Sequence, residues 1–264
     1  MPSSFSVALF FILGAIFGSY ANVLIYRVPK GENTVTSRSH CPKCQHLISW
    51  YDNIPLLSWL FLGGRCRRCK GKISFRYFIV ELLMAILFAG LWVKIGWKFT
   101  LLEYLVLAFG LVVVSFIDLD HMILPDRFTL SGIVIGIVGS FINPERSWED
   151  ALLGILFGGG FLWAVAYFYL LLRKQEGLGG GDIKLLAWIG AVLGWKPIPF
   201  IILSSSLVGT LVGIFVMLRS KSGLKTIIPF GPYIALGALI YIFWGQEIAE
   251  WYLHIFIPYL SPVN

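Results

Sequence analysis

Long apolar runs separated by short polar segments constrain this chain more than any other feature. Hydrophobic residues make up 58% of its 264 residues, and charged residues make up only 13%. A soluble domain has about 25% charged residues. Several of the runs reach about 20 residues, the length at which an α-helix crosses the hydrocarbon core of a bilayer. The sequence therefore predicts an all-α protein that passes through a lipid bilayer several times.

We expect about eight membrane-crossing helices. They are predicted at residues 5–25, 77–97, 99–117, 128–142, 151–172, 183–193, 197–218 and 227–244. The sixth run is too short to cross a full bilayer unaided and is expected to be a half-buried helix. The first run lacks the basic start of a signal peptide, so it is expected to be a retained helix. The aromatic tail at 246–259 is expected to lie in the membrane interface.

The loop at 27–76 divides the chain into three parts: a first helix at 1–26, the loop domain, and a membrane core at 77–264. The loop holds ten Lys and Arg residues and all four cysteines. The cysteines form two CxxC pairs, Cys41 with Cys44 and Cys66 with Cys69. Four thiolates in this spacing are typical of a structural zinc site, because they complete a tetrahedral shell and leave no open position. The sequence thus predicts a zinc site with four cysteine ligands.

Two other uses of the cysteines are open at this stage. A pair of disulfides would require an oxidising compartment, and the positive charge of the loop indicates the cytoplasm instead. A redox CxxC would need a thioredoxin-like strand and helix, which the flanking sequence lacks. His40 and His46 flank the first pair, and with four cysteines available we expect them not to bind the metal. The apolar segment at 50–60 is expected to lie on the membrane surface or to pack on the zinc module.

Orientation follows from the distribution of basic residues. With the 27–76 loop in the cytoplasm, the inner side receives 17 Lys and Arg residues and the outer side receives 4. This bias is the positive-inside pattern. The formal charge of +7 therefore fits cytoplasmic loops next to anionic lipid, and no nucleic-acid partner is predicted. The same arrangement places Asp118 and Asp182 on the cytoplasmic side.

These two aspartates are the candidate catalytic residues. Asp118 directly follows the apolar run 111–117, and Asp182 follows a glycine run that includes Gly179 and Gly181. Charges at membrane depth are costly and are mostly kept for function. Two carboxylates that converge can share a proton and carry out acid–base chemistry. The hypothesis is that the pair hydrolyses a peptide bond.

Other polar residues receive structural interpretations. Asp126 follows Pro125 in a capping position, and Asp120 is expected to be solvated at the interface. Glu81 is expected to be a capping or snorkelling carboxylate near the start of its helix, with a site facing the loop domain as the alternative. In the first helix, Gly14 and Gly18 offer a small face for a neighbouring helix, and Asn22 is expected to bond across helices.

Four segments taken together resemble the type IV prepilin peptidase family. They are residues 18–29, the two CxxC pairs around 52–55, residues 117–126, and residues 179–185, which contain the family's GxGD element. The resemblance implies an aspartic protease of the bacterial inner membrane that cuts the basic leader from type IV prepilins, or from type II secretion pseudopilins, at the cytoplasmic face. Its catalytic carboxylates match Asp118 and Asp182, and Gly179 and Gly181 match the glycines of GxGD.

The resemblance also implies a second activity. Many bacterial members methylate the new amino terminus with S-adenosylmethionine, and the zinc loop accompanies those members. The sequence contains no glycine-rich fingerprint for this methyl donor, so its binding site is unknown from sequence.

Three other functions are kept open. A presenilin-type intramembrane protease shares GxGD, but the basic zinc loop and the shallow aspartates favour the prepilin interpretation. A proton-coupled transporter would typically show internal repeats and carboxylates at mid-membrane, and neither is evident. A non-catalytic membrane scaffold with a zinc module would tolerate Asn at both aspartates.

Overall fold

The computed structural model describes residues 2–35, 38–175, 179–219 and 228–256. The chain divides into two compact units, Met1–Gly132 and Ile133–Asn264.

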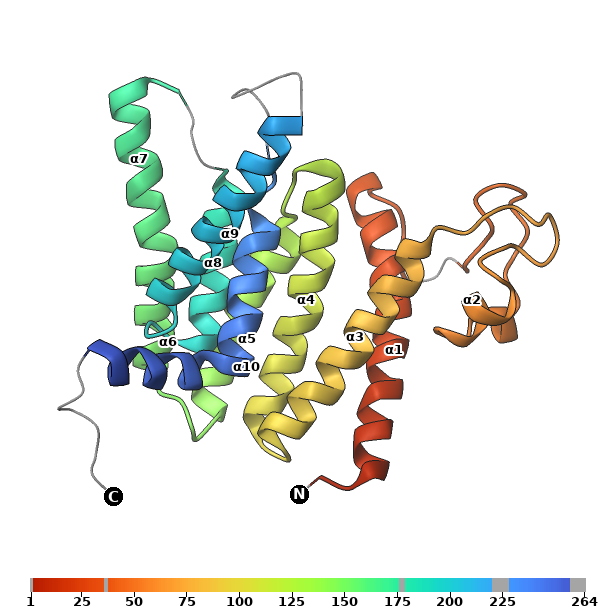
Figure 1. The fold of residues 1–264 in the computed structure, drawn as a ribbon, viewed down its shortest axis with the longest axis horizontal. Coiled ribbons are helices and arrows are strands. Elements are labelled where there is room, and N and C mark those ends of the chain that lie inside the picture. Colours follow the sequence, from red (N-terminus) through yellow and green to blue (C-terminus); the bar gives the residue numbers. More distant parts are fainter. Residues whose placement is uncertain (1, 36–37, 176–178, 220–227, 257–264) are drawn as a thin grey trace. The chain divides into compact units, whose positions relative to one another are not determined.

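The first unit is built on three long helices. They are α1 (Ser4–Arg27), α3 (Phe75–Ile95) and α4 (Phe99–His121), and they pack on one another (Figure 1). Ser3 caps α1 by accepting the N–H of Ser6, and Ser74 caps α3 by accepting the N–H of Arg76. These side chains satisfy backbone donors that a helix start leaves without partners. Each long helix therefore begins at a capping residue or directly after a short turn.

Glycines bring α1 and α3 together, as the sequence predicts. A Cβ on Gly18 would lie 2.6 Å from Glu81 Cα, and one on Gly14 would overlap the backbone of Met84. Asn22 Nδ2 then donates to the Tyr77 carbonyl at 3.0 Å, which confirms the expected bond between helices. Close approach of this kind is how helices pack where lipid supplies no hydrophobic driving force.

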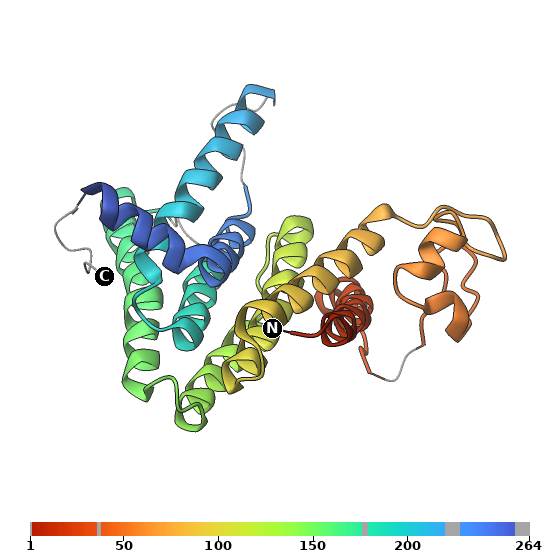
Figure 2. The same cartoon turned by 60° about the horizontal axis from the view of Figure 1, so that its bottom comes forward.

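The segment between α1 and α3 forms a separate module of mostly irregular backbone. It begins with η1 (Val28–Lys30) and contains η2 (Trp50–Asn53) and the short helix α2 (Leu57–Phe61). Figure 2 shows the part around α2 lying beyond the ends of α1 and α3. The module is the connection between the end of α1 at Arg27 and the start of α3 at Phe75.

The second unit is also helical. The elements are α5 (Asp126–Ile142), which begins in the first unit, α6 (Trp148–Ile155), the π-helical stretch η3 (Leu156–Gly160), α7 (Phe161–Arg173), α8 (Gly180–Leu193), α9 (Ile198–Arg219) and α10 (Gly231–Phe256). α6, η3 and α7 run on as one long helical segment. α8 is packed by α6, η3 and α10, and its residues 185–192 are all buried.

Backbone packing around α8 depends on glycine. A Cβ on Gly154 of α6 would overlap the Gly190 carbonyl of α8, and a Cβ on Gly158 would lie 2.6 Å from the Leu186 carbonyl oxygen. The π-helical turn at 156–160 adds a local distortion within the same segment. Gly158, which belongs to the run of three glycines at 158–160 in the predicted helix 151–172, therefore serves close helix packing.

Five helical segments of the described residues are long and apolar enough to cross a membrane: Ser4–Lys30, Phe75–Ile95, Phe99–His121, Trp148–Arg173 and Ile198–Arg219. They agree with five of the predicted spans to within a few residues, and the chain is a multi-pass membrane protein by this pattern. α8 has 14 residues, in agreement with the expected short helix. The helix expected at 227–244 begins at Gly231 and continues to Phe256; Ile227 and the end of the expected tail, 257–259, lie outside the described residues.

Candidate functional site

The four cysteines lie on two knuckles of the same construction. In the first, the Cys41 N–H donates to the His46 carbonyl and the Gln45 N–H donates to the Cys41 carbonyl. In the second, Cys66 and Lys70 make the equivalent bonds, with Gly71 as the acceptor for Cys66. Gln45 and Lys70 hold the same place and share a left-handed backbone, with φ of 56° and 55°. Each CxxC turn therefore presents its two thiols from the same backbone shape.

The thiols form one cluster that fits a metal ion. The four Sγ atoms all lie within 4.8 Å of one another, and Cys41 Sγ is 3.8 Å from Cys69 Sγ. Ligands about 2.3 Å from a tetrahedral zinc ion are about 3.8 Å apart, so this separation suits the ion. All four cysteines are free thiols, which argues against the disulfide interpretation. The predicted gathering of Cys41, Cys44, Cys66 and Cys69 at one point is confirmed.

The thiols of the cluster also differ in acidity. Burial raises the pKa of the Cys41 thiol, but hydrogen bonds from the backbone N–H groups of Cys44 and Lys43 and contacts with neighbouring thiols lower it to about 7. Cys69 accepts a backbone hydrogen bond from Gly71 that lowers its pKa, yet desolvation and the neighbouring thiols raise it to about 11. A divalent cation bound by the four thiols would replace their protons.

An ion pair connects the second knuckle to the segment between the knuckles. Arg67 donates from Nε at 2.9 Å and from Nη2 at 2.7 Å to the two oxygens of Asp52. This pair raises the pKa of the Arg67 guanidinium. Bidentate contacts of this kind fix orientation as well as distance. Asp52 thus positions η2 against the Cys66–Cys69 turn.

Glu81 joins the module to the membrane helix α3. Its side chain is buried, and Oε2 accepts the backbone N–H of Leu56 at 2.7 Å. Leu56 has a φ of 63°, an unusual backbone for a branched residue, directly before α2. Glu81 also interacts with the Ser19 side chain of α1. The expectation of a capping or snorkelling carboxylate is wrong, because Glu81 faces inward and holds the loop domain, as the alternative interpretation had it.

The segment at 50–61 carries an exposed aromatic surface. Trp50 is 79% exposed and Phe61 is 85% exposed, while the Trp59 ring packs on the rings of Phe75 and Phe78 at 5.2 Å. One side of the segment therefore packs on the start of α3, which the sequence does not predict, and the Asp52–Arg67 pair attaches the segment to the second cysteine knuckle, in agreement with one of the two expected placements. The other side remains exposed.

Asp118 is buried in the last turn of α4. Arg76, in the first turn of α3, clamps that helix end with three contacts. Its Nη1 lies 2.5 Å from Asp120, its Nη2 donates to the Phe116 carbonyl at 2.9 Å, and its guanidinium lies 4.8 Å from the Phe116 ring centroid. Asp120 is therefore an ion-pair partner, whereas the sequence indicates only a solvated residue.

Asp182 is buried in the first turn of α8. Gly179 is the N-cap of this helix, and the Asp182 N–H donates to the Gly179 carbonyl at 3.1 Å. A Cβ on Gly179 would lie 3.4 Å from Asp182 Oδ2, whereas one on Gly180 would meet nothing within 4 Å. Gly181 is the second residue of α8. Since Asp118 belongs to the first unit and Asp182 to the second, their pairing stays a prediction.

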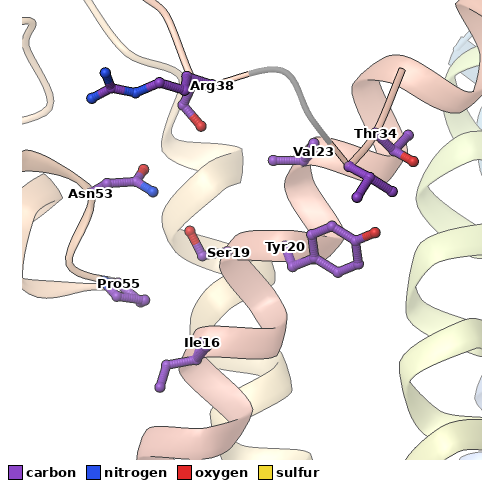
Figure 3. Close-up of a pocket in the computed structure, with 10 residues that line it drawn as sticks. Ile16, Ser19, Tyr20, Val23, Thr34, Arg38, Asn53 and Pro55 are labelled. Carbon is purple, nitrogen blue, oxygen red and sulfur yellow. The ribbon is translucent and has the colours of Figure 1, made fainter. Parts of the chain in front are cut away.

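A pocket of about 410 Å³ lies in the first unit, between the loop end of α1 and the module. Figure 3 shows Ser19 and Ile16 of α1 on one side of it and Asn53 and Pro55 on the other. The sequence does not predict this pocket, because its lining comes from three separate segments. The lining consists of Ile16, Ser19, Tyr20, Val23, Thr34, Val35, Arg38, Ser39, Asn53 and Pro55.

Comparison with known families matches two successive regions of the chain. Residues 12–95 match the Bacterial Peptidase A24 N-terminal domain, and residues 105–214 match the Type IV leader peptidase family. The cysteines, Glu81 and the pocket lie within the first match. Asp118 and Asp182 lie within the second.

Curated relatives agree over nearly the whole chain. A protein of Aeromonas hydrophila is 39% identical over 278 residues, covering 95% of this chain and 94% of its own length. A protein of Pseudomonas aeruginosa is 37% identical, covering 92% and 91%. Both are named prepilin leader peptidase/N-methyltransferase. No solved structure matches this chain significantly. The identity and coverage of these relatives show that this chain belongs to the type IV leader peptidase family.

Proposed function

We propose that this protein is a membrane aspartic endopeptidase that cleaves the basic leader from type IV prepilins or pseudopilins and then methylates the new amino terminus. The observation that carries the proposal is the place of the two buried aspartates. Both lie buried at a helix terminus, and both lie in the region, 105–214, that matches the leader peptidase family. The names of the relatives supply the substrate class and the second activity.

Asp118 and Asp182 act as an acid–base pair in this proposal. Two carboxylates a few ångströms apart do not both ionise, so the pair shares one proton. The ionised member takes a proton from water as the water attacks the scissile carbonyl. The protonated member polarises that carbonyl and later gives its proton to the leaving amine. The bilayer holds the apolar helix of the substrate and so fixes the scissile bond near the interface.

The helix ends suggest which member carries the charge. Asp182 lies in the first turn of α8, where the partial positive charge of the helix N-terminus stabilises a carboxylate. Asp118 lies in the last turn of α4, at the opposite end of a helix dipole. We therefore assign the shared proton to Asp118 and the role of base to Asp182.

The proposed topology has eight spans with the loop domain and both aspartates on the cytoplasmic side of a bacterial inner membrane. α5, α8 and α10 would supply the three crossings beyond the five long apolar segments. The positive-inside distribution supports this orientation. A structural zinc ion held by the four cysteines would order the loop domain, whose backbone is mostly irregular.

Cleavage of a prepilin by membranes that contain the wild type, Asp118→Asn or Asp182→Asn tests the peptidase proposal. We expect each variant to accumulate normally and to lose about 10²–10⁴-fold in cleavage rate, the range that acid–base groups contribute. A wild type that cuts a full transmembrane peptide and leaves prepilin intact would support the presenilin-type alternative. Near wild-type cleavage by either variant would show that the pair is wrongly assigned.

A further inference from the structure

The two regions that match family models differ in their content of candidate catalytic residues. Both aspartates lie in the region that matches the leader peptidase family, residues 105–214. The region 12–95 matches a separate domain that contains neither aspartate. If the family region supplies peptide cleavage, methyl transfer needs a different binding site. The pocket between α1 and the loop domain lies wholly within residues 12–95.

The pocket is supported by a buried arginine. Arg27, at the end of α1, is only 5% exposed, and it donates to the carbonyls of Asn33 and Arg38 at 3.1 Å each. These bonds hold the backbone on both sides of the lining residues Thr34 and Val35. The walls of the pocket are therefore fixed by contacts that reach back to the membrane helix.

The opposite wall is fixed in the same way. Asn53 and Pro55 lie between the Arg67–Asp52 ion pair and the Leu56 N–H that Glu81 accepts. Glu81 also interacts with the lining residue Ser19. The buried carboxylate of Glu81 thus stands directly behind the pocket wall and connects its two sides.

The chemistry of the lining selects a ligand with both polar and apolar parts. Arg38 offers a guanidinium, which pairs with a carboxylate in bidentate fashion. Asn53 offers an amide that both donates and accepts, which suits a purine edge or a ribose hydroxyl. Ile16, Val23 and Pro55 offer apolar surface. The volume of about 410 Å³ lies within the roughly 300–1,000 Å³ typical of small-molecule sites.

We propose that this pocket binds S-adenosylmethionine, the methyl donor of the second activity. The inference rests on the proposed function, because it takes the donor from that reaction. Arg38 would receive the carboxylate of the methionine part, and Asn53 with the hydroxyls of Ser19 and Thr34 would receive the adenosine.

The test is equilibrium binding of S-adenosylhomocysteine, which cannot donate a methyl group, to the full-length protein in lipid nanodiscs by isothermal titration calorimetry. We expect saturable binding by the wild type and a loss of roughly tenfold or more in Arg38→Ala and in Asn53→Ala, because each removes a polar partner of the ligand. Lys30→Ala is the matched control. It removes a cation from the same loop that packs on Tyr26 and does not line the pocket, so its affinity should stay within about twofold.

A second measurement uses the wild type alone, so that it does not depend on the folding of a variant. Ultraviolet irradiation with radiolabelled S-adenosylmethionine, followed by peptide mapping, should place the label within residues 12–95. Label within 105–214, or pocket variants that bind like the wild type, would overturn the proposal. If the wild type cuts prepilin while these results fail, only the donor site is wrong. If it binds the probe in the pocket but cuts no prepilin, the peptidase proposal fails and the donor site stands.

Discussion

The two units hold their aspartates in contrasting ways. In the first unit, the end of α4 that carries Asp118 is fixed by side-chain polar contacts from Arg76 to Asp120 and to the Phe116 carbonyl. In the second unit, the helix that begins beside Asp182 is fixed by backbone packing, since Gly154 and Gly190 let α6 and α8 approach without side chains between them. One aspartate is positioned by a clamp and the other by close contact of helices.

This difference separates the consequences of substitution. A polar clamp is made by the tip of one long side chain, so its removal leaves the surrounding helices free to keep their packing. Glycine contacts between backbones cannot relax in this way, because neither helix has a flexible group to move aside. We therefore expect loss of the clamp at the end of α4 to act on activity, and added bulk between α6 and α8 to act on stability.

The largest effect is expected from removal of the metal site. Cys41→Ser and Cys69→Ser should each take the zinc content from about one ion per chain to near zero, because the site has only four ligands. Zinc in small modules contributes a binding free energy of about 10–16 kcal/mol to folding. The module should therefore lose its structure, and methylation should fall more than cleavage. Elemental analysis and separate assays of the two activities check this.

His40→Ala is the control for the metal variants. His40 precedes Cys41, and the variant should retain the ion because four thiols already complete the shell. Loss of zinc in His40→Ala, or full methylation by a Cys variant that has no metal, would contradict the structural role of the site.

Features with a local pattern could be predicted from the sequence. The spacing of the two CxxC pairs predicts that their four thiols gather in one cluster. The length of the apolar runs predicts the long helices, and the small residues on one face of α1 predict its packing on α3. Each depends on residues that are close in sequence or that follow one periodicity. The role of Asn22 is predictable for a related reason, since a polar residue in a spanning helix needs a partner on a neighbouring helix.

Features that depend on distant pairs could not be predicted. Glu81 bonds to Leu56, 25 residues away, and Arg76 pairs with Asp120, 44 residues away. Arg146 is one of the four basic residues that the predicted topology places on the outer side, yet its guanidinium donates to the carbonyls of Gly136 and Ala191. A charge near a helix end has the same sequence signature whether it meets solvent or a buried carbonyl, so only the fold distinguishes these cases.

A smaller effect is expected from adding a methyl group between α6 and α8. Gly154→Ala should lower the free energy of unfolding by about 1–3 kcal/mol, because its Cβ would meet the Gly190 backbone. Gly160→Ala is the matched control, since its Cβ would make only ordinary contact at 3.5 Å with the Leu156 side chain. Unfolding midpoints in detergent measure both. Equal midpoints would show that α8 is not fixed by this contact.

The smallest and most selective effect is expected from Arg76→Ala. Without the clamp, the end of α4 can move, and the cleavage rate kcat should fall about tenfold because small displacements of a reacting group are costly. KM and the unfolding midpoint should change little, since Arg76 is assigned a positioning role and touches no substrate. Arg76→Lys should recover only part of kcat, because lysine keeps the charge but loses the planar fork that reaches Asp120 and the Phe116 carbonyl together.

Arg67→Ala is the matched control, because it removes another arginine–aspartate pair of the same unit that lies in the zinc module. If Arg67→Ala lowers kcat as much as Arg76→Ala does, the effect comes from disturbance of the unit as a whole, and Asp118 does not depend on a specific clamp.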